Sequence, residues 1–183
     1  MDTALRQKPK ITVNLDTRNA FITNGRVKFT GIKAGLDFGK TIKFGAGYHF
    51  LQTPIYRDTL QFRVAYVALY GEYIFLKSKR WEFSLPVQLG AGNSSYEYTD
   101  NTTGLKNRIN EKMIVLYEPA LAAQYKFFKW LGFGMGMGYR IMLVNNKAID
   151  EKMTSPIYVF HLKVFPGVII RGIFGKKKEK GKK

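Results

Sequence analysis

The chain has 183 residues and a formal net charge of +17, with 45% hydrophobic and 15% aromatic residues. This length predicts a single domain, and the apolar content excludes an intrinsically disordered chain. The sequence has no cysteine and two histidines, which excludes disulfides, thiolate metal sites and cysteine nucleophiles and leaves little material for a histidine-based site.

Membrane insertion by helices is not predicted, because no run of 18 consecutive apolar residues occurs. The first residues, from Met1 to Ala4, lack the basic and apolar regions of a signal peptide. If the protein is exported, we therefore expect this chain to be the mature form behind an added Met1. Strands that face lipid with every second residue would escape such a search for apolar runs.

The hydrophobic pattern has a period of two, which is typical of strands with one apolar and one polar face. Asn24-Gly25 predicts a two-residue hairpin turn, and a change of phase near Gly31 predicts a β-bulge in the next strand. Eight alternating strands are predicted, over residues 11–22, 27–38, 42–50, 60–75, 81–91, 113–125, 131–143 and 156–165.

The predicted connections alternate in length, except at the Asn24-Gly25 hairpin. Short turns are predicted near Gly39, Lys77 and Phe128. Longer loops are predicted over residues 54–59, 93–112 and 145–155, the second with or without strand extensions around Tyr96 and Tyr98. An even number of strands of about ten residues, with short turns at one end and long loops at the other, is typical of membrane barrels.

The sequence therefore predicts an all-β fold, namely an eight-stranded antiparallel transmembrane up-and-down β-barrel with a polar, ion-paired lumen. The alternative is a soluble eight-stranded barrel of lipocalin type, in which the apolar face points inward. The two differ in which face of the strands lies inside.

The polar face carries charges of both signs between glycine and alanine residues. An eight-stranded barrel has an interior just wide enough to be filled by side chains, so we expect this face inside, as a network of ion pairs without bulky aromatic rings. The apolar face would then meet lipid. The residues expected in the lumen network are Asp16, Arg18, Asp37, Lys43, Glu72, Glu82, Glu118, Arg140 and Lys163.

Aromatic residues gather near the strand ends, where two belts are expected to meet the lipid headgroups. The expected belt residues are Trp81, Tyr125 and Trp130 at the short-turn end and Tyr48, Tyr139 and Tyr158 toward the loops. A soluble barrel would instead place these rings in a core or a ligand cavity.

The sequence predicts no enzyme and no cofactor or metal site. Glycine alternates from Gly132 to Gly138 without the strand–turn–helix setting of a nucleotide loop, and we expect it to line the lumen wall. His49 and His161 are also expected in the lumen. Neither is followed two residues later by serine, as it would be in the His/Ser/Glu set of outer-membrane lipid A deacylases. A lipid-modifying enzyme and a narrow channel or carrier remain the alternative functions.

The domain organisation is expected to comprise a disordered N-terminal segment (1–9), the barrel (10–174) and a disordered basic tail (175–183). Residues 165–174 are apolar and either finish the last strand or dock against the barrel rim or a partner. The tail lysines, Lys176, Lys177, Lys178, Lys180, Lys182 and Lys183, are expected in the periplasm, facing anionic surfaces. No helix or stacking platform organises the remaining positive charge, so nucleic acid is not an expected partner.

The chain resembles small outer-membrane β-barrel proteins of the Bacteroidota type in residues 16–22 (DTRNAFI), 44–48 (FGAGY) and 81–90 (WEFSLPVQLG). Asp2-Thr3-Ala4 and Asp58-Thr59-Leu60 also resemble the O-glycosylation sequon of that phylum. The resemblance implies the outer membrane of a Gram-negative bacterium. It further implies an accessory subunit of a secretion, gliding or barrel-assembly machine, with outer-membrane lipids and other envelope proteins as partners.

Overall fold

The structure, a computed structural model, describes residues 9–22, 25–38, 41–53, 55–57, 60–99, 105–128, 130–144 and 153–166. Within these ranges the chain forms nine strands, which are β1 (Lys10–Ile22), β2 (Gly25–Phe38), β3 (Ile42–Leu51), β4 (Ile55–Arg57), β5 (Leu60–Lys77), β6 (Trp81–Thr99), β7 (Lys106–Lys126), β8 (Leu131–Val144) and β9 (Ser155–Val164). The eight predicted strands correspond to all of these except β4.

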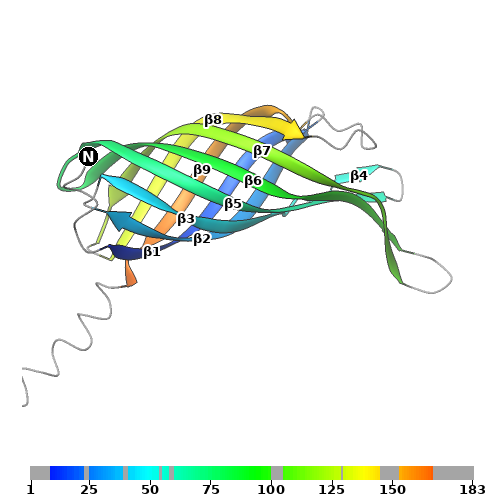
Figure 1. Ribbon diagram of the computed structural model, residues 1–183, viewed down its shortest axis with the longest axis horizontal. Helices are drawn as coiled ribbons and strands as arrows, with labels where there is room; N and C mark the ends of the chain where they lie inside the picture. Colours follow the sequence, from blue (N-terminus) through cyan, green and yellow to red (C-terminus); the bar gives the residue numbers. More distant parts are fainter. Residues whose placement is uncertain are drawn as a thin grey trace, which may run out of the picture.

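The strands close into a ring of eight. Each ring strand pairs antiparallel with the ring strand that follows it in the chain, β3 pairs directly with β5, and β1 pairs with β9. β4 lies outside the ring and pairs only with β5. Closure leaves the ring without unpaired edges, as a membrane-spanning sheet requires. The predicted eight-stranded up-and-down barrel is confirmed (Figure 1).

Part of the sheet continues beyond the ring at the end that carries the longer connections. Residues 55–57, 60–64, 94–99 and 106–112 belong to it, and we call them the extension. The strand extensions allowed around Tyr96 and Tyr98 are present, but most of the loop expected over residues 93–112 is wrong. Strands β6 and β7 pair from the Trp81–Tyr125 pair to the Thr99–Lys106 pair. The loop expected over residues 54–59 likewise contains β4. Figure 1 shows the β6–β7 hairpin projecting from the barrel and curling away at its tip.

A bulge in this hairpin accompanies the curl. Ser94 pairs with Lys112 and Tyr96 pairs with Ile109, so β7 has one more residue than β6 between these two pairs. Asn110 lies in the bulge with a φ of 55°, a left-handed conformation that asparagine adopts more readily than most residues. Such bulges bend the strand and increase its twist.

The bulge expected near Gly31 is wrong. β1 and β2 pair without a register shift, from the Ile22–Gly25 pair at one end to the Lys10–Asp37 pair at the other. The phase of the hydrophobic pattern changes there because the inner face of β2 changes character along its length. Val27 and Phe29 point inward, on the same face as Lys33 and Asp37.

The outer face of the ring is apolar on every strand. Exposed residues include Leu15, Ile32, Leu69, Leu89, Met137 and Phe160, one from each of six ring strands. Contiguous apolar surface of this extent suits lipid rather than water. A soluble barrel of lipocalin type would bury this face, so that alternative is wrong.

Several other sequence expectations fall on residues outside the described ranges. Among them are the basic tail over residues 175–183, the N-terminal segment up to Lys8, Asn24 of the hairpin turn and Asp58-Thr59 of the second sequon. β9 ends at Val164, so the apolar stretch that begins at Phe165 does not extend the last strand within the described residues. In the described ranges, no helix has the length and apolar character needed to cross a membrane.

Candidate functional site

The barrel interior holds the chemically distinctive side chains, and its centre contains a cluster of five buried charges. We call Asp16, Arg18, Lys33, Glu118 and Arg140 the central cluster. Arg18 bridges the two carboxylates, since one guanidinium nitrogen pairs with Glu118 and the other lies 3.1 Å from Asp16. Lys33 Nζ lies 2.7 Å from the same Asp16 oxygen, and Arg140 Nε pairs with Glu118.

Strand alternation brings these charges together. Asp16 and Arg18 are two residues apart on β1 and therefore share a face, while β2, β7 and β8 contribute one charge each. Gln88 on β6 completes the hydrogen bonding. It accepts from Arg18 at 2.8 Å and donates to Glu118 at 3.2 Å.

A second cluster lies closer to the short-turn end. We call Lys43, Glu72, Glu82, Lys126 and Lys163 the turn-end cluster. Lys43 Nζ lies 3.2 Å from Glu72 and also pairs with Glu82. Lys126 Nζ lies 2.8 Å from Glu82, and Lys163 Nζ lies 3.7 Å from Glu72. Each carboxylate thus faces at least two cations, which compensates for its removal from water.

The structure places all nine expected lumen residues in the interior. Eight of them belong to the two clusters, and Asp37 is buried on β2 in register with Lys43. Sequence reasoning did not include Lys33, Lys126 or Gln88 in the network. Lys33 could have been found, because it lies on the same polar face of β2 as Asp37.

The interior at the loop end is apolar, which corrects the expectation that bulky rings would not fit inside. Phe29, Phe62 and Tyr66 are each at most 1% exposed, and they pack in one core with aliphatic residues. The other members of this core are Ala20, Val27, Leu51, Val64, Ala68, Tyr96, Ile114, Leu116, Met153, Ile157 and Val159.

Glycines make room for these rings. A Cβ at Gly90 would lie 2.8 Å from Tyr66 Cδ2, and one at Gly92 would lie 2.6 Å from Tyr66 Cβ. A narrow barrel can therefore hold large rings where facing positions lack side chains. Arg140 joins the two halves of the interior, since its guanidinium lies 4.1 Å from the Phe29 ring centroid and donates to Tyr66 Oη at 3.1 Å.

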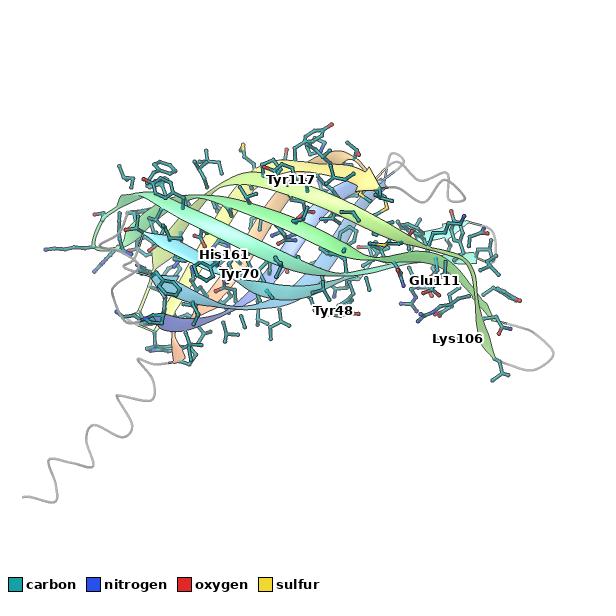
Figure 2. All side chains as sticks on the ribbon, viewed as in Figure 1. Tyr48, Tyr70, Lys106, Glu111, Tyr117 and His161 are labelled. Atoms are coloured by element: carbon teal, nitrogen blue, oxygen red, sulfur yellow. The ribbon has the colours of Figure 1, made fainter. Side chains whose placement is uncertain are left out.

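A cavity of about 40 Å³ lies among the charged residues. Its lining includes Asp16, Lys33, Glu72, Tyr70 and His161, and the last two are labelled inside the barrel in Figure 2. A water molecule needs about 10–15 Å³ of cavity volume, so the cavity has space for a few water molecules. The apolar core lies between this cavity and the loop end of the barrel.

Each histidine lies across the sheet from a glycine. His49 pairs with Gly31, and His161 pairs with Gly134. A Cβ at either glycine would overlap the histidine ring, so each ring covers the glycine backbone. The His49 ring also stacks on Tyr66 at 5.0 Å between centroids. These contacts give both histidines a packing role.

No metal centre is evident in the described part of the chain, where no three His, Cys, Asp or Glu residues come together in a suitable group. His49 Nε2 lies 3.7 Å from Asp16, and Asp16 is already paired with Arg18 and Lys33. The carboxylates of the interior are arranged to neutralise cations rather than to hold a metal ion.

The expected aromatic belt residues lie on the outer wall. Trp81 packs edge-on against Tyr125, with 5.0 Å between ring centroids, and Trp130 stacks on Phe128 at 5.7 Å. All of these rings lie at the short-turn end. Toward the loops, the exposed belt residues are Tyr48, Tyr139 and Tyr158.

Solved structures to which the chain is similar include outer-membrane barrels of Gram-negative bacteria. Neisserial surface protein A has a TM-score of 0.64 at 13% identity, covering 86% of this chain and 96% of its own. The N-terminal β-barrel domain of OprF from Pseudomonas aeruginosa has a TM-score of 0.51 at 9% identity, with coverages of 86% and 98%.

Ail, the attachment invasion locus protein of Yersinia pestis, in its complex with the heparin analogue sucrose octasulfate, has a TM-score of 0.50 at 8% identity. The match covers 85% of this chain and 94% of that one. At these identities the likeness establishes the fold. No protein-family model and no curated protein sequence matches the chain.

Proposed function

We propose that this protein is a non-enzymatic outer-membrane β-barrel that serves as a structural or accessory subunit of a larger cell-envelope complex. The observation that carries the proposal is the filled interior. An apolar core occupies the loop end, and paired charges occupy the rest. A barrel filled in this way works through its outer surfaces, and its partners would be outer-membrane lipids and other envelope proteins rather than nucleic acid.

The outer-membrane location rests on the apolar outer wall, the aromatic rings at both ends and the kind of protein that shares the fold. Barrels of this class have short periplasmic turns and longer extracellular loops. The extension would then project from the cell surface, and the start of β1 and the end of β9 would lie on the periplasmic side. An origin in Bacteroidota is part of the proposal and rests on the sequence resemblance alone.

Planar-bilayer recordings test the proposal against a channel or carrier. We expect no stable, large single-channel conductance from the purified chain, because Phe29, Phe62 and Tyr66 fill the lumen at the loop end. A reproducible open state of high conductance would overturn the sealed-barrel proposal.

Native purification in mild detergent, followed by mass spectrometry, tests the accessory role. We expect specific envelope proteins to co-purify with the full chain. Deletion of residues 175–183 should release those that contact the basic tail, and replacement of its six lysines by glutamine should do the same if charge is responsible. If the full chain purifies alone under these conditions, the accessory-subunit proposal fails.

A further inference from the structure

A groove of about 590 Å³ is hollowed in the outer wall where the extension leaves the ring. Its lining residues on β5 and β6 include Arg63, Val67, Ala91 and Glu97, which lie on the outward face of the sheet. The volume is within the range of about 300–1,000 Å³ typical of small-molecule sites. In Figure 2, Tyr48 lies on the ring, whereas Glu111 and Lys106 lie farther along the projecting hairpin.

One wall of the groove is continuous with the lipid-facing surface. Tyr48 and Phe50 are 49% and 43% exposed, and their ring centroids lie 6.3 Å apart. Val67 and Ala91 are neighbours in the β5–β6 register and extend this apolar wall. Hydrocarbon that covers the barrel can therefore enter the groove without crossing polar surface.

The opposite wall carries three cations around one carboxylate. Arg63, Lys106 and Arg108 lie 3.3, 3.6 and 3.9 Å from Glu97. Their side chains are 42%, 65% and 60% exposed, so each keeps donors directed at solvent. Glu111 also lines the groove, and three positive against two negative side chains leave one positive charge in excess.

We propose that this groove binds the phosphorylated headgroup of an outer-leaflet glycolipid. The phosphate would contact Arg63, Lys106 and Arg108, and the start of an acyl chain would lie along Tyr48 and Phe50. A ligand with an anion and hydrocarbon side by side matches both walls, whereas a soluble anion matches one. The inference rests on the proposed outer-membrane location, with the extension on the outer side.

The test uses the purified full chain in nanodiscs of phosphatidylcholine that contain a small fraction of bis-phosphorylated lipid A. Native mass spectrometry counts the lipid A molecules retained on the protein. We expect retention of bis-phosphorylated lipid A and at least several-fold less retention of its dephosphorylated form. Inorganic phosphate or a soluble sulfated polysaccharide, added in excess, should not displace it. Equal retention of the two forms, or displacement by the soluble polyanion, would overturn the proposal.

Substitutions distinguish lipid A binding in the groove from non-specific attraction to the positive surface of the protein. The double variant R63Q/R108Q should weaken retention about tenfold, because it removes two charged contacts to phosphate. The control K10Q/K79Q removes two exposed lysines at the short-turn end and should leave retention unchanged. E97Q should strengthen retention, because it removes the carboxylate that competes with phosphate for three cations.

The opposite signs expected for E97Q and R63Q/R108Q keep the test informative even if one variant folds poorly. If R63Q/R108Q behaves like K10Q/K79Q, or if E97Q weakens retention, the groove is not a phosphate site. The assay contains no other protein, so its failure would leave the accessory-subunit proposal standing, and isolation of the full chain without partners would leave the lipid site standing.

Discussion

Replacement of Glu118 by glutamine should destabilise the barrel strongly, because it removes the carboxylate that two arginines share. Arg18 would keep its contact with Asp16 at 3.1 Å. Arg140 would keep Tyr66 Oη at 3.1 Å, the Phe29 ring at 4.1 Å and a neutral amide oxygen in place of the carboxylate, so no anion would face its guanidinium. Leaving a buried charge without its counter-ion costs about 3–5 kcal/mol, and we expect E118Q to lose that much stability.

Urea unfolding of the chain in phosphatidylcholine vesicles, followed by the fluorescence of Trp81 and Trp130, measures this loss. The matched control is Glu97→Gln, whose cationic partners are 42–65% exposed, and we expect it to cost at most about 1 kcal/mol. Adding Arg140→Met to E118Q removes the stranded charge and should recover at least half of the loss. The reasoning fails if E118Q costs no more than E97Q, or if Arg140→Met brings no recovery.

Two further predictions concern residues of the inner face, namely Gly45 and the two histidines, and the first has Gly71, on the outer face of β5, as its control. Gly45→Ala should lower the free energy of unfolding by about 1–3 kcal/mol in the same assay, because the added Cβ would overlap the Ala34 carbonyl oxygen. Gly71→Ala should leave the free energy of unfolding nearly unchanged, since nothing lies within 4 Å of the added Cβ. Replacement of both His49 and His161 should leave lipid A composition unchanged in a strain that lacks the native copy, as judged by mass spectrometry. Acylation that changes with the wild-type gene and not with the double variant would favour the enzyme alternative.

The eight-stranded ring could be predicted because the same alternation of apolar with small or polar residues recurs on every ring strand. Residues such as Leu69, Leu89 and Met137 alternate with small or polar residues, and lipid imposes that alternation over the whole membrane-spanning length. The charges inside follow from the same pattern, since an acidic residue such as Glu118 on a polar face requires cations from other strands. Which cations it meets depends on strand register, which hydropathy does not encode.

The sequence allowed strand extensions around Tyr96 and Tyr98 but did not predict the full extension, because the composition of residues 93–112 is that of a loop. Polar residues such as Asn107 and Asn110 predict turns, yet β6 and β7 pair through this region. The pairing is held from inside by Tyr96 and Phe62, whose ring centroids lie 5.6 Å apart and which are buried in the apolar core. A tertiary contact of this kind overrides local propensity and leaves little trace in the sequence.

The apolar core could not be predicted from the sequence, for a different reason. Hydropathy alternation distinguishes the two faces of a strand only when one face is polar, and Val27 and Phe29 make the inner face of β2 resemble its outer face. The same core lowers the local dielectric at Arg140, which strengthens its pairing with Glu118 and raises the cost of breaking it. The apolar core and the buried charges therefore depend on each other. Replacing Phe29 by alanine should weaken both, because it opens a void beside Arg140 and admits water to the cluster.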